Sequence, residues 1–137
     1  MLSQTAEYAL RTVVFLADRS EAPVRIDEIA AALDIPRNYL SKVLYRLAQE
    51  SVLTSTRGQG GGFRLASPAE RICLLDVIEP FDHIGSQRRC LLGRAVCSDQ
   101  RACEAHEAWK EVGARVAAFF AGTTVADLAG GAARRRR

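Results

Sequence analysis

The most constraining feature of this sequence is a pair of apolar helix patterns separated by only the tripeptide Asp34-Ile35-Pro36. Residues 27–33 carry apolar side chains at helical spacing behind two carboxylates, which favour the partially positive start of a helix. Pro36 suits the first turn of the second helix, where its missing N–H has no partner to lose. Apolar residues then recur at i, i+3, i+4 and i+7, namely Leu40, Val43, Leu44 and Leu47. This arrangement predicts a helix-turn-helix.

A glycine-rich hairpin pattern follows directly. Residues 52–57 and 63–66 are strand-like and flank Gly58-Gln59-Gly60-Gly61-Gly62, which is typical of a hairpin tip. A phosphate-binding loop is the rival interpretation, but it requires Gly-Lys-Ser/Thr opening a helix, and Phe63 instead begins an apparent strand. A hairpin after a helix-turn-helix predicts a winged helix, although a hairpin with a purely structural role is the other alternative.

Polar side chains around this motif are candidates for DNA contact. A helix entering the major groove presents polar residues from its first turns, and a wing can reach phosphates or a narrow minor groove. The candidates that avoid the apolar stripe, or that flank the glycines, are Arg37, Asn38, Ser41, Lys42, Arg57 and Arg64. Residues 36–66 contain five basic residues against one acidic residue, an excess of four positive charges, so we expect a double-stranded DNA partner. Ordinary solvated faces are the alternative.

Further helix patterns frame this region. Residues 3–17 form an amphipathic pattern, and a short helix over residues 74–79 is expected to end at Pro80. Residues 104–120 are helical again, and four large apolar residues recur there at about 3.5-residue spacing, which keeps a seam facing another helix. These are Trp109, Val112, Val116 and Phe119. They predict a long C-terminal dimerisation helix.

Three cysteines lie in the aperiodic segment between these last two helices, at Cys90, Cys97 and Cys103. The N-terminus lacks a signal-peptide pattern and no segment is apolar enough to span a bilayer, so we expect a cytoplasmic protein with no membrane partner. A reducing cytosol disfavours structural disulfides. Three thiolates in one loop fit an iron-sulfur cluster, and their charge could be offset by neighbouring arginines. Those arginines are Arg88, Arg89, Arg94 and Arg101.

Other roles for the thiols stay open. Structural zinc prefers tighter cysteine spacings, and metal-free thiols could act as a redox switch. Cys73 lies among apolar neighbours and is expected to be a small buried side chain. His106 follows Cys103 by one helical turn and could complete the metal site, with a surface histidine as the alternative. His83 is interpreted as a loop residue.

The whole order of motifs resembles the Rrf2 family of winged-helix transcription regulators over residues 1–128, and the cysteine series is more like IscR-type than NsrR-type members. The resemblance is carried by Tyr8-Ala9-Leu10-Arg11, Asn38-Tyr39-Leu40, the run from Arg57 to Phe63, and Cys103-Glu104-Ala105-His106 leading to Trp109. It implies homodimers on near-palindromic operators. It also implies an alternative fourth cluster ligand, Glu7 of the partner's first helix, because some relatives use an acidic residue there. A solvated Glu7 is the simpler interpretation.

We therefore expect a mainly α protein with a small β wing. Residues 1–79 are predicted to form the winged helix-turn-helix, 80–104 the cluster-binding loop, 105–128 the dimerisation helix and following turn, and 129–137 a disordered basic tail. The expected function is a transcription regulator whose operator binding is controlled by a 2Fe-2S or 4Fe-4S cluster that senses iron, redox state or nitric oxide. A thiol switch or zinc site is the alternative. A redox or metal-handling enzyme is disfavoured, since no Cys-x-x-Cys pair or acid-base constellation accompanies the thiols.

Overall fold

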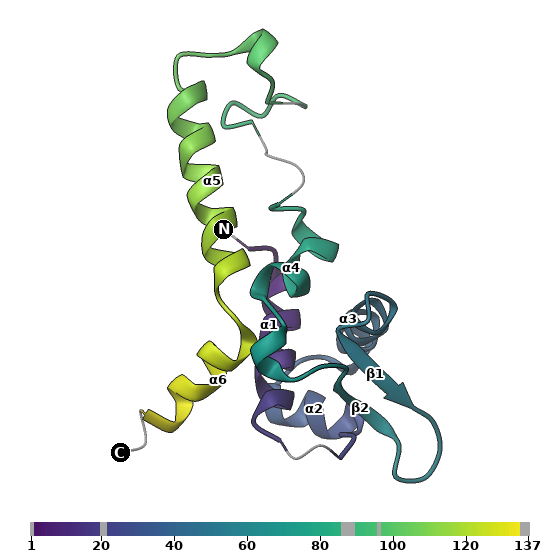
Figure 1. Ribbon diagram of the computed structural model, residues 1–137. Helices are drawn as coiled ribbons and strands as arrows, with labels where there is room; N and C mark the ends of the chain where they lie inside the picture. Colours follow the sequence, from purple (N-terminus) through teal and green to yellow (C-terminus); the bar gives the residue numbers. More distant parts are fainter. Residues whose placement is uncertain (1, 20–21, 86–89, 96, 135–137) are drawn as a thin grey trace.

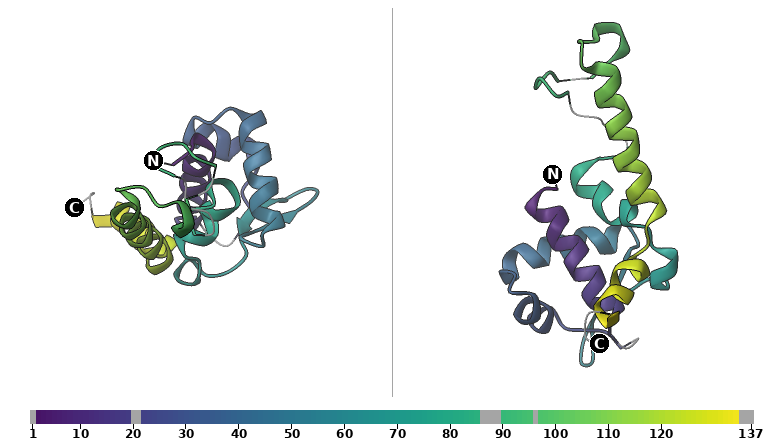
Figure 2. Two further views of the ribbon diagram at one scale, coloured as in Figure 1. Left: turned by 90° about the horizontal axis from the view of Figure 1, so that it is seen from above. Right: turned by 90° about the vertical axis from the view of Figure 1, so that its left-hand side faces the viewer.

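The computed structural model describes residues 2–19, 22–85, 90–95 and 97–134. The helices are α1 (Gln4–Ala17), α2 (Ile26–Leu33), α3 (Arg37–Gln49), α4 (Leu74–Asp82), α5 (His106–Gly122) and α6 (Val125–Arg134), with 3-10 turns η1 (Ala69–Arg71) and η2 (Asp99–Arg101). Strands β1 (Leu53–Thr56) and β2 (Gly62–Leu65) form one antiparallel sheet. The predicted fold class is confirmed. Figure 1 shows α5 rising away from the other elements, and the right-hand view of Figure 2 shows the same projection from the side.

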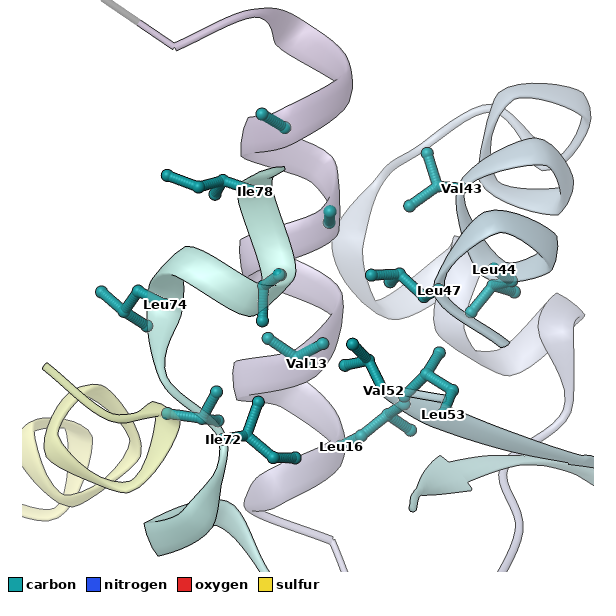
Figure 3. Packing of buried hydrophobic residues seen from close by; sticks show 14 of the residues in the cluster. Val13, Leu16, Val43, Leu44, Leu47, Val52, Leu53, Ile72, Leu74 and Ile78 are labelled. Atoms are coloured by element: carbon teal, nitrogen blue, oxygen red, sulfur yellow. The ribbon is translucent and has the colours of Figure 1, made fainter. Parts of the chain in front are cut away.

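The helix-turn-helix is formed by α2 and α3. α2 ends at Asp34, whose left-handed backbone (φ 52°) reverses the chain, and α3 begins directly after Pro36. The four apolar residues of the α3 stripe are at most 1% exposed. They face α1, where Val13 and Leu16 complete a core shared with α4 (Figure 3). Burying one such side chain contributes about 1.5–3 kcal/mol, so this stripe fixes how α3 lies in the head, which we define as residues 2–82 together with α6.

The wing is tied to the chain just before α2. β1 and β2 pair from Leu53 with Leu65 to Thr56 with Gly62. Val24 forms an isolated antiparallel bridge with Phe63 of β2. Its N–H donates to the Phe63 carbonyl at 2.9 Å, and its carbonyl accepts from the Phe63 N–H at 2.8 Å. A side chain at Gly62 (φ 145°) would collide with the Val24 carbonyl, so this close approach requires glycine.

The end of α4 differs from the prediction. The helix continues past Pro80 to Asp82 and ends at His83, which has a left-handed backbone (φ 51°). Proline removes one amide donor, but the next turn is still closed by the His83 N–H, which donates to the Glu79 carbonyl at 3.1 Å. The boundary expected at residue 79 is therefore wrong by three residues.

The C-terminal region folds back onto the head. Leu74 N–H donates to the Thr123 carbonyl (2.9 Å) and Val125 N–H to the Ile72 carbonyl (2.8 Å), which places the α5–α6 junction against the start of α4. α6 then packs along α1. Its first turn has a reciprocal cap, in which Thr124 N–H donates to the Asp127 carboxylate and Asp127 N–H donates to the Thr124 hydroxyl.

This helix corrects the expected C-terminal tail. The prediction of disorder from residue 129 is wrong as far as Arg134, because the cap and the contact with α1 hold a helix in spite of Gly130 and Gly131. Residues 135–137 lie outside the described residues. Within the described ranges, no helix combines the length and apolar character needed to cross a bilayer.

Candidate DNA interface and candidate cysteine site

The predicted DNA-contacting residues of α3 all lie on its exposed side. Arg37, Asn38, Ser41 and Lys42 are exposed, opposite the buried stripe. The Arg37 Nε donates to the Asp27 carboxylate at 2.7 Å, and the two side chains remain 64% and 68% exposed. This pair joins the starts of α2 and α3 at the surface, so it holds the Arg37 side chain beside the first turn of α2.

The wing extends the same surface. Arg64 pairs with Thr54 in the sheet and Arg57 follows the last residue of β1, and both arginine side chains are exposed. The hairpin projects from the same side of the head as α3 (Figures 1 and 2). The structure thus brings all six predicted DNA-contacting residues to α3 and the adjoining hairpin.

Two aromatic residues add to this surface. Tyr39 is 55% exposed and Tyr45 is 65% exposed, although large aromatic side chains usually bury most of their area. Tyr45 was not among the predicted contacts, yet it follows Asn38 and Lys42 at spacings of seven and three residues and therefore lies on their side of α3. That spacing was the signal in the sequence that could have identified it.

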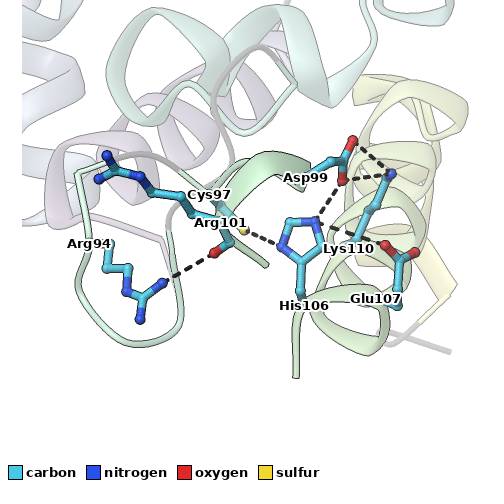
Figure 4. Close-up of polar contacts among 7 residues, drawn as sticks. All are labelled: Arg94, Cys97, Asp99, Arg101, His106, Glu107 and Lys110. Atoms are coloured by element: carbon cyan, nitrogen blue, oxygen red, sulfur yellow. Dashed lines mark hydrogen bonds and ion pairs between the residues drawn. The ribbon is translucent and has the colours of Figure 1, made fainter. Parts of the chain in front are cut away.

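The cysteine segment, which we define as residues 90–95 and 97–105, lies at the end of α5 remote from the head (Figure 1). Cys90, Cys97 and Cys103 are half-buried. The Cys97 Sγ lies 3.4 Å from the Nδ1 of His106, the first residue of α5. His106 is only 2% exposed, which rules out the alternative of a surface histidine, and the thiol beside its Nδ1 is that of Cys97, whereas the sequence pointed to Cys103 (Figure 4).

Cys103 has a different relation to His106. It precedes α5 instead of sharing its first turn, and its carbonyl accepts a hydrogen bond from the His106 N–H at 3.0 Å. Cys90 lies earlier in the same segment, where backbone N–H groups of Arg94 and Leu92 lower the pKa of its thiol. Of the arginines expected to offset thiolate charge, Arg94 donates to the Arg101 carbonyl at 3.2 Å. Arg88 and Arg89 lie outside the described residues.

Asp99 contacts the other nitrogen of the His106 ring. Its Oδ1 lies 2.7 Å from His106 Nε2 and 3.2 Å from the Nζ of Lys110. The hydrogen bonds from His106 and then Lys110 hold the pKa of the Asp99 carboxyl below its usual range. Sequence reasoning missed Asp99, because an exposed aspartate in an aperiodic loop carries no pattern. Asp99, His106 and Glu107 also bring ligand atoms within 4.8 Å of one another, a hard oxygen and nitrogen set that could hold a metal ion.

The remaining sites lie in the head. Cys73 Sγ donates to the Asp76 carboxylate at 3.0 Å, and burial, followed by Asp76, raises the pKa of this thiol. Cys73 pairs with Thr124 beyond one end of α5, whereas His106 begins the other end. A 17-residue helix is about 25 Å long, so Cys73 is remote from the Cys97–His106 contact. Glu7 is exposed on the first turn of α1.

Comparison with known proteins places these features in context. Residues 2–131 match the family model Rrf2, described as "Iron-dependent Transcriptional regulator". A protein of Aquifex aeolicus assigned as an HTH-type transcriptional regulator is 36% identical over 130 residues, which cover 93% of this chain and 90% of the relative. The HTH-type transcriptional regulator IscR of Escherichia coli is 30% identical over 128 residues, covering 93% of this chain and 78% of IscR.

Two solved structures share the fold. CymR of B. subtilis, described as the global cysteine regulator, superposes with a TM-score of 0.80 at 24% identity, covering 95% of this chain and 96% of CymR. IscR of T. potens superposes with a TM-score of 0.78 at 22% identity, covering 96% and 88% of the two chains.

Proposed function

Because the chain belongs to the Rrf2 family of DNA-binding transcriptional regulators, which are not enzymes, we propose that an iron-sulfur cluster controls its binding to a DNA operator. The ligands are Cys90, Cys97, Cys103 and His106. The contact between Cys97 Sγ and His106 Nδ1 carries this proposal, since it brings a thiol and an imidazole from two segments together at a residue that is 2% exposed. The description of the family as iron-dependent supports it.

The donor set fits such a cluster. Iron-sulfur clusters are held by cysteine thiolates, and histidine replaces cysteine in some of them. The three cysteines of this segment are half-buried, and the fourth donor is an imidazole already held beside one of them. When bound, the cluster supplies a centre that can change oxidation state or lose iron. The chain's own residues then convert that change into a movement of the head.

The position of the cysteine segment explains how such a signal reaches DNA. The segment connects α4 to α5, α5 packs on α4, and α4 in turn packs against α1 and contacts α3. A rearrangement around Cys97 and His106 therefore shifts α4 and α5 together. We propose that α3 enters the major groove and that Arg57 and Arg64 of the wing contact phosphates. In this arrangement the segment between the end of α4 and the start of α5 forms the regulatory loop.

A dimer would present two α3 helices to two half-sites. On α5, Val112 is 48% exposed and Phe119 is 57% exposed, which is costly for a monomer in water. Trp109 and Val116 on the same stripe are half-buried, and Val116 packs against the core of its own chain. We therefore place the homodimer seam on the Val112 and Phe119 side of α5, in a pairing of this helix with its copy.

Anaerobic purification tests the cluster. The wild-type protein should absorb in the visible and give an iron-sulfur Mössbauer spectrum, and Cys90→Ala, Cys97→Ala and Cys103→Ala should each lose the colour. Cys73→Ala is the matched control, because this thiol lies at the opposite end of α5 and should leave the colour intact. Loss of colour in the control would overturn the three-cysteine assignment, and a colourless wild-type protein after anaerobic iron and sulfide reconstitution would refute the cluster.

The fourth ligand and the regulation need two further measurements. His106→Ala should change the electron paramagnetic resonance spectrum while Glu7→Ala should not, and the reverse result would transfer the fourth site to Glu7 of the partner. Holo and apo protein should differ in affinity for a DNA duplex selected in vitro with the wild-type protein. Equal affinities would remove the cluster from control of DNA binding.

A metal-free thiol switch is the second candidate, and the lowered pKa of Cys90 favours it because a larger thiolate fraction reacts faster with oxidants. Under this candidate, oxidation of iron-free protein changes DNA affinity and dithiothreitol restores it. Mass spectrometry of the oxidised protein would then place the modified thiol at Cys90. Unchanged affinity on oxidation of the iron-free protein excludes the switch.

A further inference from the structure

We infer that Asp99 is a positioning residue that holds the Nε2 proton of His106 and so presents Nδ1 of this ring to the cluster. The inference rests on the proposed cluster site and goes beyond it, because it assigns the coordinating atom and names the group that selects it. The resulting chain runs from Lys110 through Asp99 and His106 to the side of Cys97 (Figure 4).

The distances determine where the ring proton lies. Asp99 Oδ1 is 2.7 Å from His106 Nε2, a length typical of a charge-assisted hydrogen bond. An ionised carboxylate has no hydrogen to donate, so Nε2 must carry the proton. In the neutral ring Nδ1 then keeps its lone pair, and it faces the Cys97 Sγ at 3.4 Å. The free lone pair therefore points toward the thiol that the proposed cluster would use.

Asp99 is itself held in place. Lys110 Nζ donates to its Oδ1 at 3.2 Å and lies within 3.5 Å of Oδ2. Lys110 is four residues beyond His106 on α5, so both partners of Asp99 come from one face of the same helix. The other nearby carboxylate, that of Glu107, is 4.0 Å from Nε2 and its side chain is 81% exposed. This distance is too long for a hydrogen bond, so Asp99 and not Glu107 orients the ring.

Burial makes this orientation important. The His106 ring is 3% exposed, so water cannot replace a lost partner at Nε2 without rearrangement of the segment. A carboxylate on the remote nitrogen fixes the tautomer and the rotation of a metal-binding histidine and raises its basicity. Loss of such a partner lowers metal affinity by about 10- to 100-fold.

The tautomer can be measured without any cluster. Long-range nitrogen-proton nuclear magnetic resonance spectra of the reduced, metal-free full chain contain signals from only two histidines, and His83→Gln assigns the other one. Wild-type His106 should be in the Nε2–H form. Asp99→Ala should populate the Nδ1–H form, whereas Glu107→Ala, which removes the other nearby carboxylate, should not. A wild-type Nδ1–H tautomer, or an unchanged tautomer in Asp99→Ala, overturns the inference.

The second measurement uses the anaerobically reconstituted protein. Histidine-specific nitrogen labelling with pulsed electron paramagnetic resonance should show a coordinated histidine nitrogen in the wild type. Cluster loss to a chelator should be about tenfold faster in Asp99→Ala and unchanged in Glu107→Ala. Equal loss rates in Asp99→Ala and wild type would overturn the inference even if the nitrogen is coordinated. Absence of nitrogen coupling in the wild type would instead refute His106 as a ligand. The role of Asp99 toward the cluster would then be refuted as well. The tautomer measurement would still decide whether Asp99 orients the ring.

Discussion

Replacing Arg37 with alanine should separate DNA binding from stability. Arg37 is the first residue of α3, and its exposed ion pair with Asp27 spans 2.7 Å. Pairs of this kind contribute about 0–1 kcal/mol to folding, so the free energy of unfolding should fall by no more than about 1 kcal/mol. A lost base contact costs about 1–3 kcal/mol, or roughly 2–6 kcal/mol for a dimer on two half-sites. This corresponds to a loss of affinity of roughly 30-fold or more.

The assay is fluorescence anisotropy with the selected duplex at several salt concentrations, beside urea unfolding of the same preparation. Arg19→Ala is the matched control. It removes the same charge and another surface ion pair, at 3.4 Å to Glu28, but from the end of α1 instead of the start of α3. It should leave affinity for the operator close to wild type. If Arg37 instead contacts a phosphate, the salt dependence should decrease by about one unit per subunit and affinity should fall for all sequences alike.

Equal affinities of Arg37→Ala and Arg19→Ala at every salt concentration would refute the placement of Arg37 in the interface. A loss of unfolding free energy well above 1 kcal/mol would show that the exposed pair with Asp27 contributes more to the fold than its surface position implies.

Three further changes test other parts of the structure. Val112→Asp should convert a dimer into a folded monomer in sedimentation velocity, and an unchanged mass would place the seam elsewhere. Gly62→Ala should lower the free energy of unfolding by about 1–3 kcal/mol, because the positive φ at this position is strained for alanine and the added Cβ would meet the Val24 carbonyl. An unchanged melting temperature would contradict this close approach. Hydrogen bonds from Thr124 lower the folded-state pKa of Asp127, so its ionised form stabilises α6 above the unfolded pKa of about 4 and loses this effect as the pH falls. Asp127→Asn should therefore be less stable than wild type at pH 7 and equally stable near pH 2, and a pH-independent difference would exclude the ionised cap.

Local spacing was sufficient to predict the elements of the head. The stripe from Leu40 to Leu47 recurs within one helix, and such a period reports directly which face is buried. The glycines at 58–62 likewise predict a hairpin from their own backbone freedom. The presence of three thiols in the cysteine segment and its position between α4 and α5 were also predictable, because they depend on order along the chain.

Contacts between distant segments required the tertiary structure. The pairing of Val24 with Phe63, and of Cys73 with Thr124, joins residues separated by 39 and 51 positions, and no local period encodes such partners. The helix over Gly130 and Gly131 was missed for the same reason, since the propensity of glycine opposes a helix that packing against α1 stabilises.

The candidate site divides in the same way. The sequence by itself identified Cys90, Cys97, Cys103 and His106 as the residues with ligand chemistry, because thiol and imidazole donors are properties of residue type. Only the tertiary structure decided that His106 is buried, that Cys97 lies beside its Nδ1, and that Asp99 occupies its Nε2. The direction of a ring and the partner of each nitrogen depend on how η2 and α5 pack together, which residue spacing along a flexible loop does not specify.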